Sequence, residues 1–261
     1  MNRILYGGLL GLSTIVAAQE KKPNVLFICV DDLRPELGCY EGKKYIKTPN
    51  LDRLAAQGVS FSNHYCAVPT SGASRYALLT GMYPNDRKAL SNEACYRFIA
   101  EKPEQATPET FIHQFRRNGY YTVGIGKISH SADGYVYGYN DPPSNKLELP
   151  HSWDEMLFNP GKWENGWNAF FAYANGTNRQ SMKNQVKPYE CGNVDDDGYP
   201  DGLTANLALD KLKELAAKDR PFFLGVGFFK PHLPFTAPRK YWDMYDEALL
   251  PLTPVPACPK T

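Results

Sequence analysis

The protein has 261 residues, of which 43% are hydrophobic and 22% are charged, and its formal net charge is +1 at pH 7. This length and composition indicate a globular chain of one domain or at most two, large enough to bury a sizeable core. The near-neutral charge and the lack of a long Lys/Arg block argue against charge-driven binding to nucleic acid or to a membrane surface.

Residues 1–18 have the pattern of a secretory signal peptide. Arg3 lies near the start, an apolar run extends from Ile4 to Val16, and the small residues Ala17 and Ala18 follow. The run is short for a bilayer span and is interrupted by Gly and Ser. We therefore expect cleavage and export, without stable membrane insertion, of a mature chain of residues 19–261.

Apolar segments of strand length alternate with helical segments along the mature chain. Strands are predicted at residues 24–30, 121–125 and 221–229, and helices at 48–58, 107–119 and 203–217. This alternation predicts an α/β fold with a mostly parallel central sheet flanked by helices. The unbroken apolar run of residues 24–30 predicts a central strand that is covered on both faces.

Polar residues that can carry chemistry follow each predicted strand. They are Asp31 and Asp32, then Lys127 and His130, then Lys230 and His232. Taken singly, each of these residues is explained by a solvated turn or by ordinary packing. Because the carboxyl ends of parallel strands meet at one edge of a sheet, their coincidence favours a single shared site.

The stretch Val68–Pro84 places Ser71 before another predicted helix, which begins between Gly72 and Arg75 and ends at Gly81. The free N–H groups and the dipole of a helix N-terminus favour an anion at that point. From these residues alone, Ser71 is either a helix cap or a nucleophile. The surrounding sequence does not match the G-x-S-x-G turn of serine hydrolases.

Aromatic residues are frequent in the aperiodic region between residues 135 and 202. Trp163, Trp167 and Tyr173 either stack on a sugar or belong to the core. The sequence leaves both alternatives open.

The segment Ser71-Gly72-Ala73-Ser74-Arg75, followed by Leu79-Thr80-Gly81, resembles the signature of the type I sulfatases. In this family the leading Cys or Ser is oxidised to formylglycine. Further blocks that match the family are Lys22–Phe27, Asp31–Arg34, Thr48–Leu54, Gly126–His130 and Lys230–Phe235. The resemblance extends from Lys22 to the C-terminus and is greatest to the iduronate-2-sulfatases and their bacterial relatives.

The resemblance implies an alkaline phosphatase/sulfatase-like fold and a reaction that removes sulfate from a sulfated sugar or glycosaminoglycan. It implies that Asp31, Asp32 and the formylglycine derived from Ser71 hold one Ca²⁺ ion. By motif position, Arg75 holds the formylglycine diol, Lys127 and His232 bind sulfate and assist the leaving group, and His130 handles a proton.

One departure from the commonest signature concerns the modifying enzyme. Ala73 stands where Pro is most frequent, and Ser71 stands where Cys is most frequent. This variant resembles the substrates of the radical-type, oxygen-independent maturase. The implied partner is therefore such a maturase, in a bacterium that exports the protein to the periplasm or the medium.

A second departure concerns the extent of the site. The family has a later strand-end block with Asp-His-Gly and a further lysine, which these 261 residues lack. Residues 19–261 are therefore expected to be the N-terminal part of a sulfatase catalytic domain, with little turnover alone. Two alternatives stay open: a non-catalytic fragment that binds sulfated glycans, and a phosphohydrolase of the same superfold.

Overall fold

The computed structural model describes residues 21–40, 45–100 and 108–250. The predicted signal peptide, residues 1–18, lies outside the described residues. Within them, no helix combines the length and the apolar character that crossing a bilayer requires.

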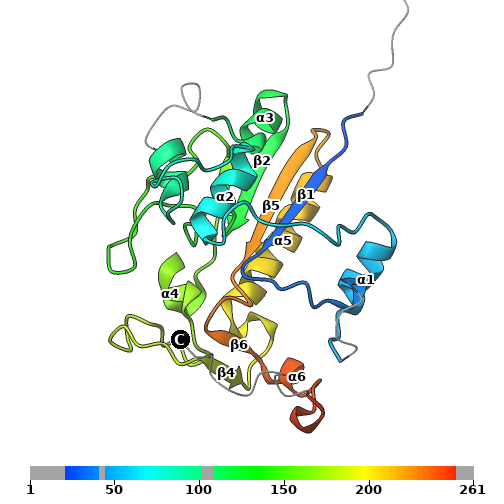
Figure 1. The fold of residues 1–261 in the computed structure, drawn as a ribbon, viewed down its shortest axis with the longest axis vertical. Coiled ribbons are helices and arrows are strands. Elements are labelled where there is room, and N and C mark those ends of the chain that lie inside the picture. The colour runs from blue at the N-terminus through cyan, green and yellow to red at the C-terminus, as the bar shows by residue number, and fades with distance from the viewer. Residues whose placement is uncertain (1–20, 41–44, 101–107, 251–261) are drawn as a thin grey trace, which may run out of the picture.

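A parallel four-stranded sheet forms the centre of the fold, with strand order β1-β5-β2-β3 (Figure 1). Its strands are β1 (Val25–Val30), β2 (Tyr121–Gly126), β3 (Glu155–Leu157) and β5 (Phe222–Phe228). Val30 pairs with Phe228, and Gly126 pairs with Gly227, so β1, β5 and β2 end at the same level. The predicted α/β fold with a parallel sheet is confirmed.

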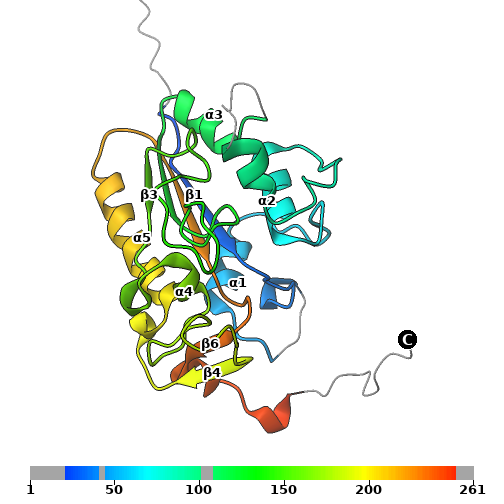
Figure 2. The same cartoon turned by 90° about the vertical axis from the view of Figure 1, so that its left-hand side faces the viewer.

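Helices cover both faces of this sheet, and Figure 2 shows α5 on one side and α2 and α3 on the other. The α-helices are α1 (Pro49–Ala56), α2 (Ser71–Thr80), α3 (Phe111–Arg117), α4 (Gly166–Phe170), α5 (Pro200–Ala216) and α6 (Arg239–Trp242). Alternate residues of β5 face opposite layers: Leu224 packs with Leu215 of α5, whereas Phe223 packs in the cluster that contains Ile112 of α3.

A second, two-stranded parallel sheet lies beyond the carboxyl ends of the main strands. It pairs β4 (Tyr189–Gly192) with β6 (Phe235–Pro238). In both ribbon views this small sheet and α4 lie at the end of the molecule toward which β5 runs (Figures 1 and 2).

The prediction that residues 24–30 form a central strand covered on both faces is wrong for the described residues. β1 lies at one edge of the sheet, and the side chains of Leu26 and Ile28 are 49% and 51% exposed. The interior positions belong to β5, which pairs with β1 and β2, and to β2, which pairs with β5 and β3. An apolar run shows that a strand is well suited to burial, whereas its place in the sheet depends on long-range pairing.

Trp163, Trp167 and Tyr173 belong to the core. Their exposures are 1%, 6% and 0%, and the two tryptophans pack in a cluster with Phe170 and Phe229. This burial favours the packing alternative over stacking of these rings on a sugar.

Candidate active site

Asp31 is the centre of the site. It follows β1 directly, its backbone N–H donates to the Phe228 carbonyl at 3.2 Å, and the residue is only 3% exposed. Its carboxylate accepts from Lys127 Nζ at 2.6 Å through Oδ2 and from Arg75 Nη2 at 2.9 Å through Oδ1. Two strand ends and one helix thus contribute to a single buried charge cluster.

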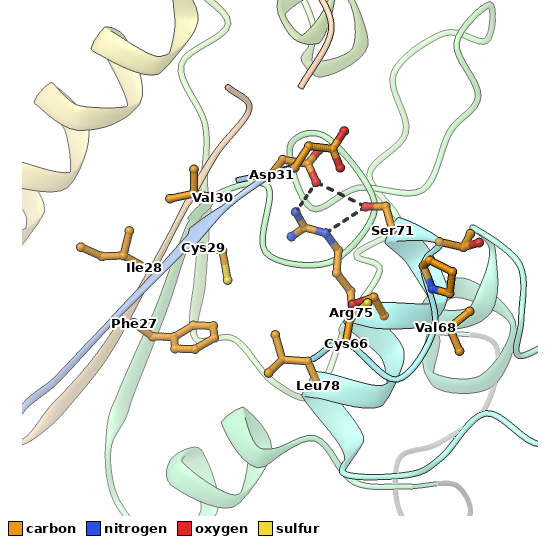
Figure 3. Close-up of a pocket in the computed structure, with 14 residues that line it drawn as sticks. Phe27, Ile28, Cys29, Val30, Asp31, Cys66, Val68, Ser71, Arg75 and Leu78 are labelled. Atoms are coloured by element: carbon orange, nitrogen blue, oxygen red, sulfur yellow. Dashed lines mark hydrogen bonds and ion pairs between the residues drawn. The ribbon is translucent and has the colours of Figure 1, made fainter. Parts of the chain in front are cut away.

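Arg75 connects α2 to this cluster and to the loop after β2 (Figure 3). Its Nε donates to Ser71 Oγ at 3.2 Å, one helical turn back. Its Nη1 donates to the carbonyl oxygens of Lys127 and Ile128, at 2.9 and 2.8 Å. The guanidinium therefore fixes Ser71, Asp31 and the Lys127 backbone relative to one another.

Ser71 is the first residue of α2, and Thr70 is the N-cap residue. The Ser71 hydroxyl donates to Asp31 Oδ1 at 3.4 Å and accepts from Arg75, so its contacts are with charged side chains of the site. The interpretation of Ser71 as a helix cap is therefore wrong. The predicted end of this helix is confirmed, because Gly81 adopts a left-handed φ of 67° after Thr80.

Lys127 is 1% exposed, and its Nζ lies 4.3 Å from the ring centroid of Phe170. A Cβ at Gly227 would lie 2.1 Å from the Lys127 carbonyl oxygen, so only glycine lets the two backbones approach this closely. Burial lowers the pKa of Lys127, and the nearby Asp31 opposes that effect.

The cluster holds more positive than negative charge, because Asp31 pairs with both Arg75 and Lys127. Burial alone would raise the pKa of Asp31, but Lys127 and Arg75 outweigh burial and hold this pKa at about 2. The carboxylate therefore stays ionised and faces two buried cations. The excess positive charge beside Ser71 favours an anionic ligand.

His232 lies at the edge of the cluster. Its Nδ1 donates to the Leu233 carbonyl at 2.7 Å, which leaves Nε2 directed toward Asp32, 3.8 Å from Oδ2. The imidazole packs on Phe170, with ring centroids 4.6 Å apart.

His130 follows Lys127 on the loop after β2. Its Nδ1 is buried and has no hydrogen-bond partner among the described residues. Burial, followed by the charges of Lys127 and Arg75, lowers the pKa of His130 to about 3. The ring is therefore neutral at pH 7 and can accept a proton only from a group that approaches it closely.

A pocket of about 580 Å³ opens between the end of β1 and α2. Figure 3 shows Asp31, Ser71 and Arg75 together at one end of it, with Phe27 and Leu78 toward the other. The polar end can take a small anionic group, while the apolar end lies along the edge of β1.

Asp31 thus contacts Lys127, as expected from the strand-end pattern, and it also contacts Ser71 and Arg75 of α2. Asp32 differs from its neighbour, because its φ of 58° turns its side chain outward and leaves it 61% exposed. Among the described residues, Asp32 pairs with His232 at 3.8 Å, and no hydrogen bond or ion pair joins it to Asp31, Ser71 or Arg75.

The same site offers oxygen donors of the kind that a hard cation prefers. Asp31, Asp32 and Ser71 offer oxygen atoms, which calcium prefers, but three residues supply fewer than the roughly six to eight ligands that calcium takes. Within the described ranges, no group of three or more His, Cys, Asp or Glu side chains is arranged to hold a metal. The residues fit calcium by type and form part of a coordination shell.

Phe170 was missed by sequence reasoning. It lies beneath both Lys127 and His232. It belongs to α4, a five-residue helix in the aperiodic region, where no pattern in the sequence distinguishes it from other aromatic residues.

Because His130 is neutral in the fold, its ring signals should not titrate between pH 5 and 8. The unfolded chain takes up this proton below the ordinary pKa of 6.5, whereas the folded chain does so only near 3. Folding stability should therefore fall as the pH drops from about 6.5 toward 3. Histidine NMR identifies the signals by their loss in His130→Asn, and a midpoint near 6.5 for those signals would contradict this description.

A model of the sulfatase family matches residues 23–249. Iduronate 2-sulfatase of Homo sapiens is 31% identical over 252 residues, covering 96% of this chain and 42% of the human protein. A sulfatase of Formosa agariphila is also 31% identical, covering 88% of this chain and 43% of that protein.

Among solved structures, the phosphonate monoester hydrolase of Agrobacterium radiobacter is similar to this chain, with a TM-score of 0.61 and 26% identity. The match covers 88% of this chain and 45% of that one. The chain therefore spans less than half the length of each of these relatives. Because the family match extends over residues 23–249, the chain belongs to the sulfatase family.

Proposed function

We propose that the protein carrying this chain hydrolyses sulfate esters at the site formed by Asp31, Ser71, Arg75 and Lys127. The observation that carries the proposal is the convergence of two buried cations on one carboxylate beside Ser71. A sulfate group has the charge and the acceptor oxygens to bind Arg75 and Lys127. Membership of the sulfatase family supports the same reaction.

Ser71 is proposed to be the precursor of formylglycine. As a plain serine it lacks a suitable base, because its acceptor Asp31 has a pKa of about 2 and holds a proton poorly. An aldehyde at residue 71 would hydrate to a diol, whose one hydroxyl attacks sulfur and whose other hydroxyl later expels sulfate by restoring the aldehyde. Oxidation of Ser71 is assigned to a radical-type, oxygen-independent maturase.

The other site residues receive roles that follow from their contacts. Arg75, which already donates to Ser71 Oγ, would hold the group at position 71 in place. Lys127 would bind the sulfate oxygens. The Nδ1 of His232 is held by the Leu233 carbonyl, so its Nε2 would be the atom that assists the leaving alcohol. By motif position, His130 would receive the proton of the non-attacking hydroxyl.

Asp31, Asp32 and residue 71 are proposed to hold one calcium ion, which would supply positive charge against the sulfate oxygens. Calcium should then raise the melting temperature, and Asp32→Asn should remove most of that rise. Asp219→Asn is the matched control, since Asp219 is an exposed aspartate that pairs only with Lys21 among the described residues. Thermal unfolding with calcium and with a chelator measures the effect, and equal calcium responses in both variants would contradict the site.

The proposed substrate is a sulfated sugar or a glycosaminoglycan. The support is the 31% identity to human iduronate 2-sulfatase over 96% of this chain. Bacterial relatives include an ulvan-active sulfatase of Formosa agariphila, which is 29% identical. The expected setting is a bacterial periplasm or the medium.

A second candidate is phosphonate or phosphate ester hydrolysis, favoured by the similarity to the Agrobacterium radiobacter phosphonate monoester hydrolase. Rates on 4-nitrophenyl sulfate and on phenyl phosphonate esters, measured on the matured protein, separate the two. We expect the sulfate ester to be the better substrate. A clear preference for the phosphonate would overturn the proposal, and sulfate binding without any turnover would favour the glycan-binding alternative.

A further inference from the structure

Asp201 lies in the first turn of α5 and contacts the segment that carries His232. Its Oδ1 accepts from the backbone N–H of Phe229 at 2.8 Å, and its Oδ2 accepts from the backbone N–H of Lys230 at 2.8 Å. Each carboxylate oxygen therefore takes one donor of the turn that follows β5. Nothing in the catalytic chemistry above uses this residue.

A carboxylate in the first turn of a helix ordinarily serves the free N–H groups of its own helix. Asp201 is directed elsewhere. The N-cap residue of α5 is Tyr199, without a side-chain cap bond, and both oxygens of Asp201 face the end of β5. The side chain thus joins the N-terminus of α5 to the turn before His232.

The turn has further contacts that make it rigid. The backbone N–H of His232 donates to the Phe229 carbonyl at 3.0 Å. Lys230 Nζ donates to the His232 carbonyl at 3.1 Å and to the Phe170 carbonyl at 3.4 Å. Phe229 is 1% exposed, with its ring 5.1 Å from that of Phe170. A shift of the turn at Asp201 would therefore carry the His232 backbone with it.

We propose that Asp201 is a positioning residue, which places the His232 imidazole at the sulfate site by fixing both N–H groups of the Phe229–Lys230 turn. The step from position to catalysis rests on the proposed function, because His232 receives its role there. Loss of water contact raises the pKa of Asp201, and the two backbone donors oppose that effect. The buried carboxylate is therefore stabilised by the two backbone N–H groups that its oxygens accept from.

The chemistry of the contact specifies aspartate. Asparagine has the same size but a single acceptor oxygen, so its amide N–H₂ would face one of the two backbone donors. Glutamate keeps both acceptors and the charge, but its extra methylene displaces the carboxylate along the turn.

The test uses the 261-residue chain and two readouts. The variant is Asp201→Asn, and the control is Asp210→Asn on the same helix, where the 77% exposed side chain of Asp210 pairs with Lys213 at 3.4 Å. Histidine NMR reports the surroundings of the His232 ring, whose signals are identified by their loss in His232→Asn. Titration with inorganic sulfate measures the affinity of the proposed site for sulfate.

Asp201→Asn should shift the His232 signals and weaken sulfate binding by about tenfold, or ~1.4 kcal/mol. Asp210→Asn should change neither. In a His232→Asn background, Asp201→Asn should weaken sulfate binding no further, because Asp201 acts through His232. If Asp201→Asn does not fold, Asp201→Glu should show a smaller shift of the His232 signals and a smaller loss of sulfate affinity.

Unchanged His232 signals in a folded Asp201 variant would overturn the inference. So would an equal loss of sulfate binding with and without His232, which is the result expected of a purely structural residue. If the wild-type chain bound no sulfate, the proposed function would fail, while the His232 signals would still decide whether Asp201 positions the ring.

Discussion

Replacement of Asp31 by asparagine is expected to destabilise the protein by roughly 3 kcal/mol. The variant leaves Lys127 and Arg75, which are 1% and 8% exposed, without the carboxylate that they share. A chain of this size should then melt roughly 6–12 °C lower. Urea and thermal unfolding in the presence of a chelator measure the change without any contribution from bound metal.

Asp32→Asn is the matched control, because Asp32 is the adjacent aspartate but its side chain is 61% exposed. It should change stability by no more than about 0.5 kcal/mol. The contribution of the Asp31 carboxylate to folding stability also depends on pH, because its pKa is about 2 in the folded protein, below the ordinary 3.8. Its stabilising effect is present above pH 4 and is lost as the pH falls toward 2. Equal effects of the two variants would contradict the buried cluster.

Ser71→Ala should leave the fold almost intact but abolish the chemistry. The hydroxyl makes two contacts with charged groups, at 3.2 and 3.4 Å, so the stability loss should stay near 1 kcal/mol. Without a residue that can become formylglycine, sulfate release by the matured protein that carries this chain should fall by at least about 10³-fold. Sulfate release and urea unfolding, measured on the same preparation, separate the two effects.

Ser91→Ala is the control for Ser71. Ser91 lies outside the pocket, and its hydroxyl donates to the Lys88 carbonyl at 2.8 Å near the surface. It should retain both stability and activity. Sulfate release by Ser71→Ala that matched the Ser91 control would show that residue 71 is not the nucleophile.

The convergence of Asp31 and Lys127 could be predicted from the sequence, although 96 positions separate them. Each residue directly follows an apolar segment, and parallel strands bring such ends to one edge. The Ser71 helix was predicted for a similar local reason, since its glycine stop and its apolar face are visible in the sequence.

The position of β1 and the role of Phe170 could not be predicted in this way. β1 and β5 are both unbroken apolar runs, and only the pairing of β5 with two neighbours decides which is central. Phe170 reaches Lys127 and His232 through space from a helix of five residues. Such contacts depend on the tertiary structure, which no local pattern encodes.

The two adjacent aspartates show the same limit on a smaller scale. In the sequence, Asp31 and Asp32 are equivalent hard ligands at one strand end. In the structure, the left-handed φ of Asp32 separates them, so that Asp31 is buried against two cations and Asp32 faces outward. Backbone conformation at a single residue therefore gives the two carboxylates different burial and different ion-pair partners, which the residue types alone do not reveal.

The central claim is that residue 71 becomes formylglycine, and the mass of the tryptic peptide Leu54–Arg75 tests it most directly. The protein is produced together with a radical-type maturase that is shown to be active on another sulfatase. We expect this peptide to be lighter by two hydrogen atoms and to react with an aldehyde probe, and Ser71→Ala to abolish both signals. An unmodified Ser71 in wild-type protein made beside that active maturase would contradict the account.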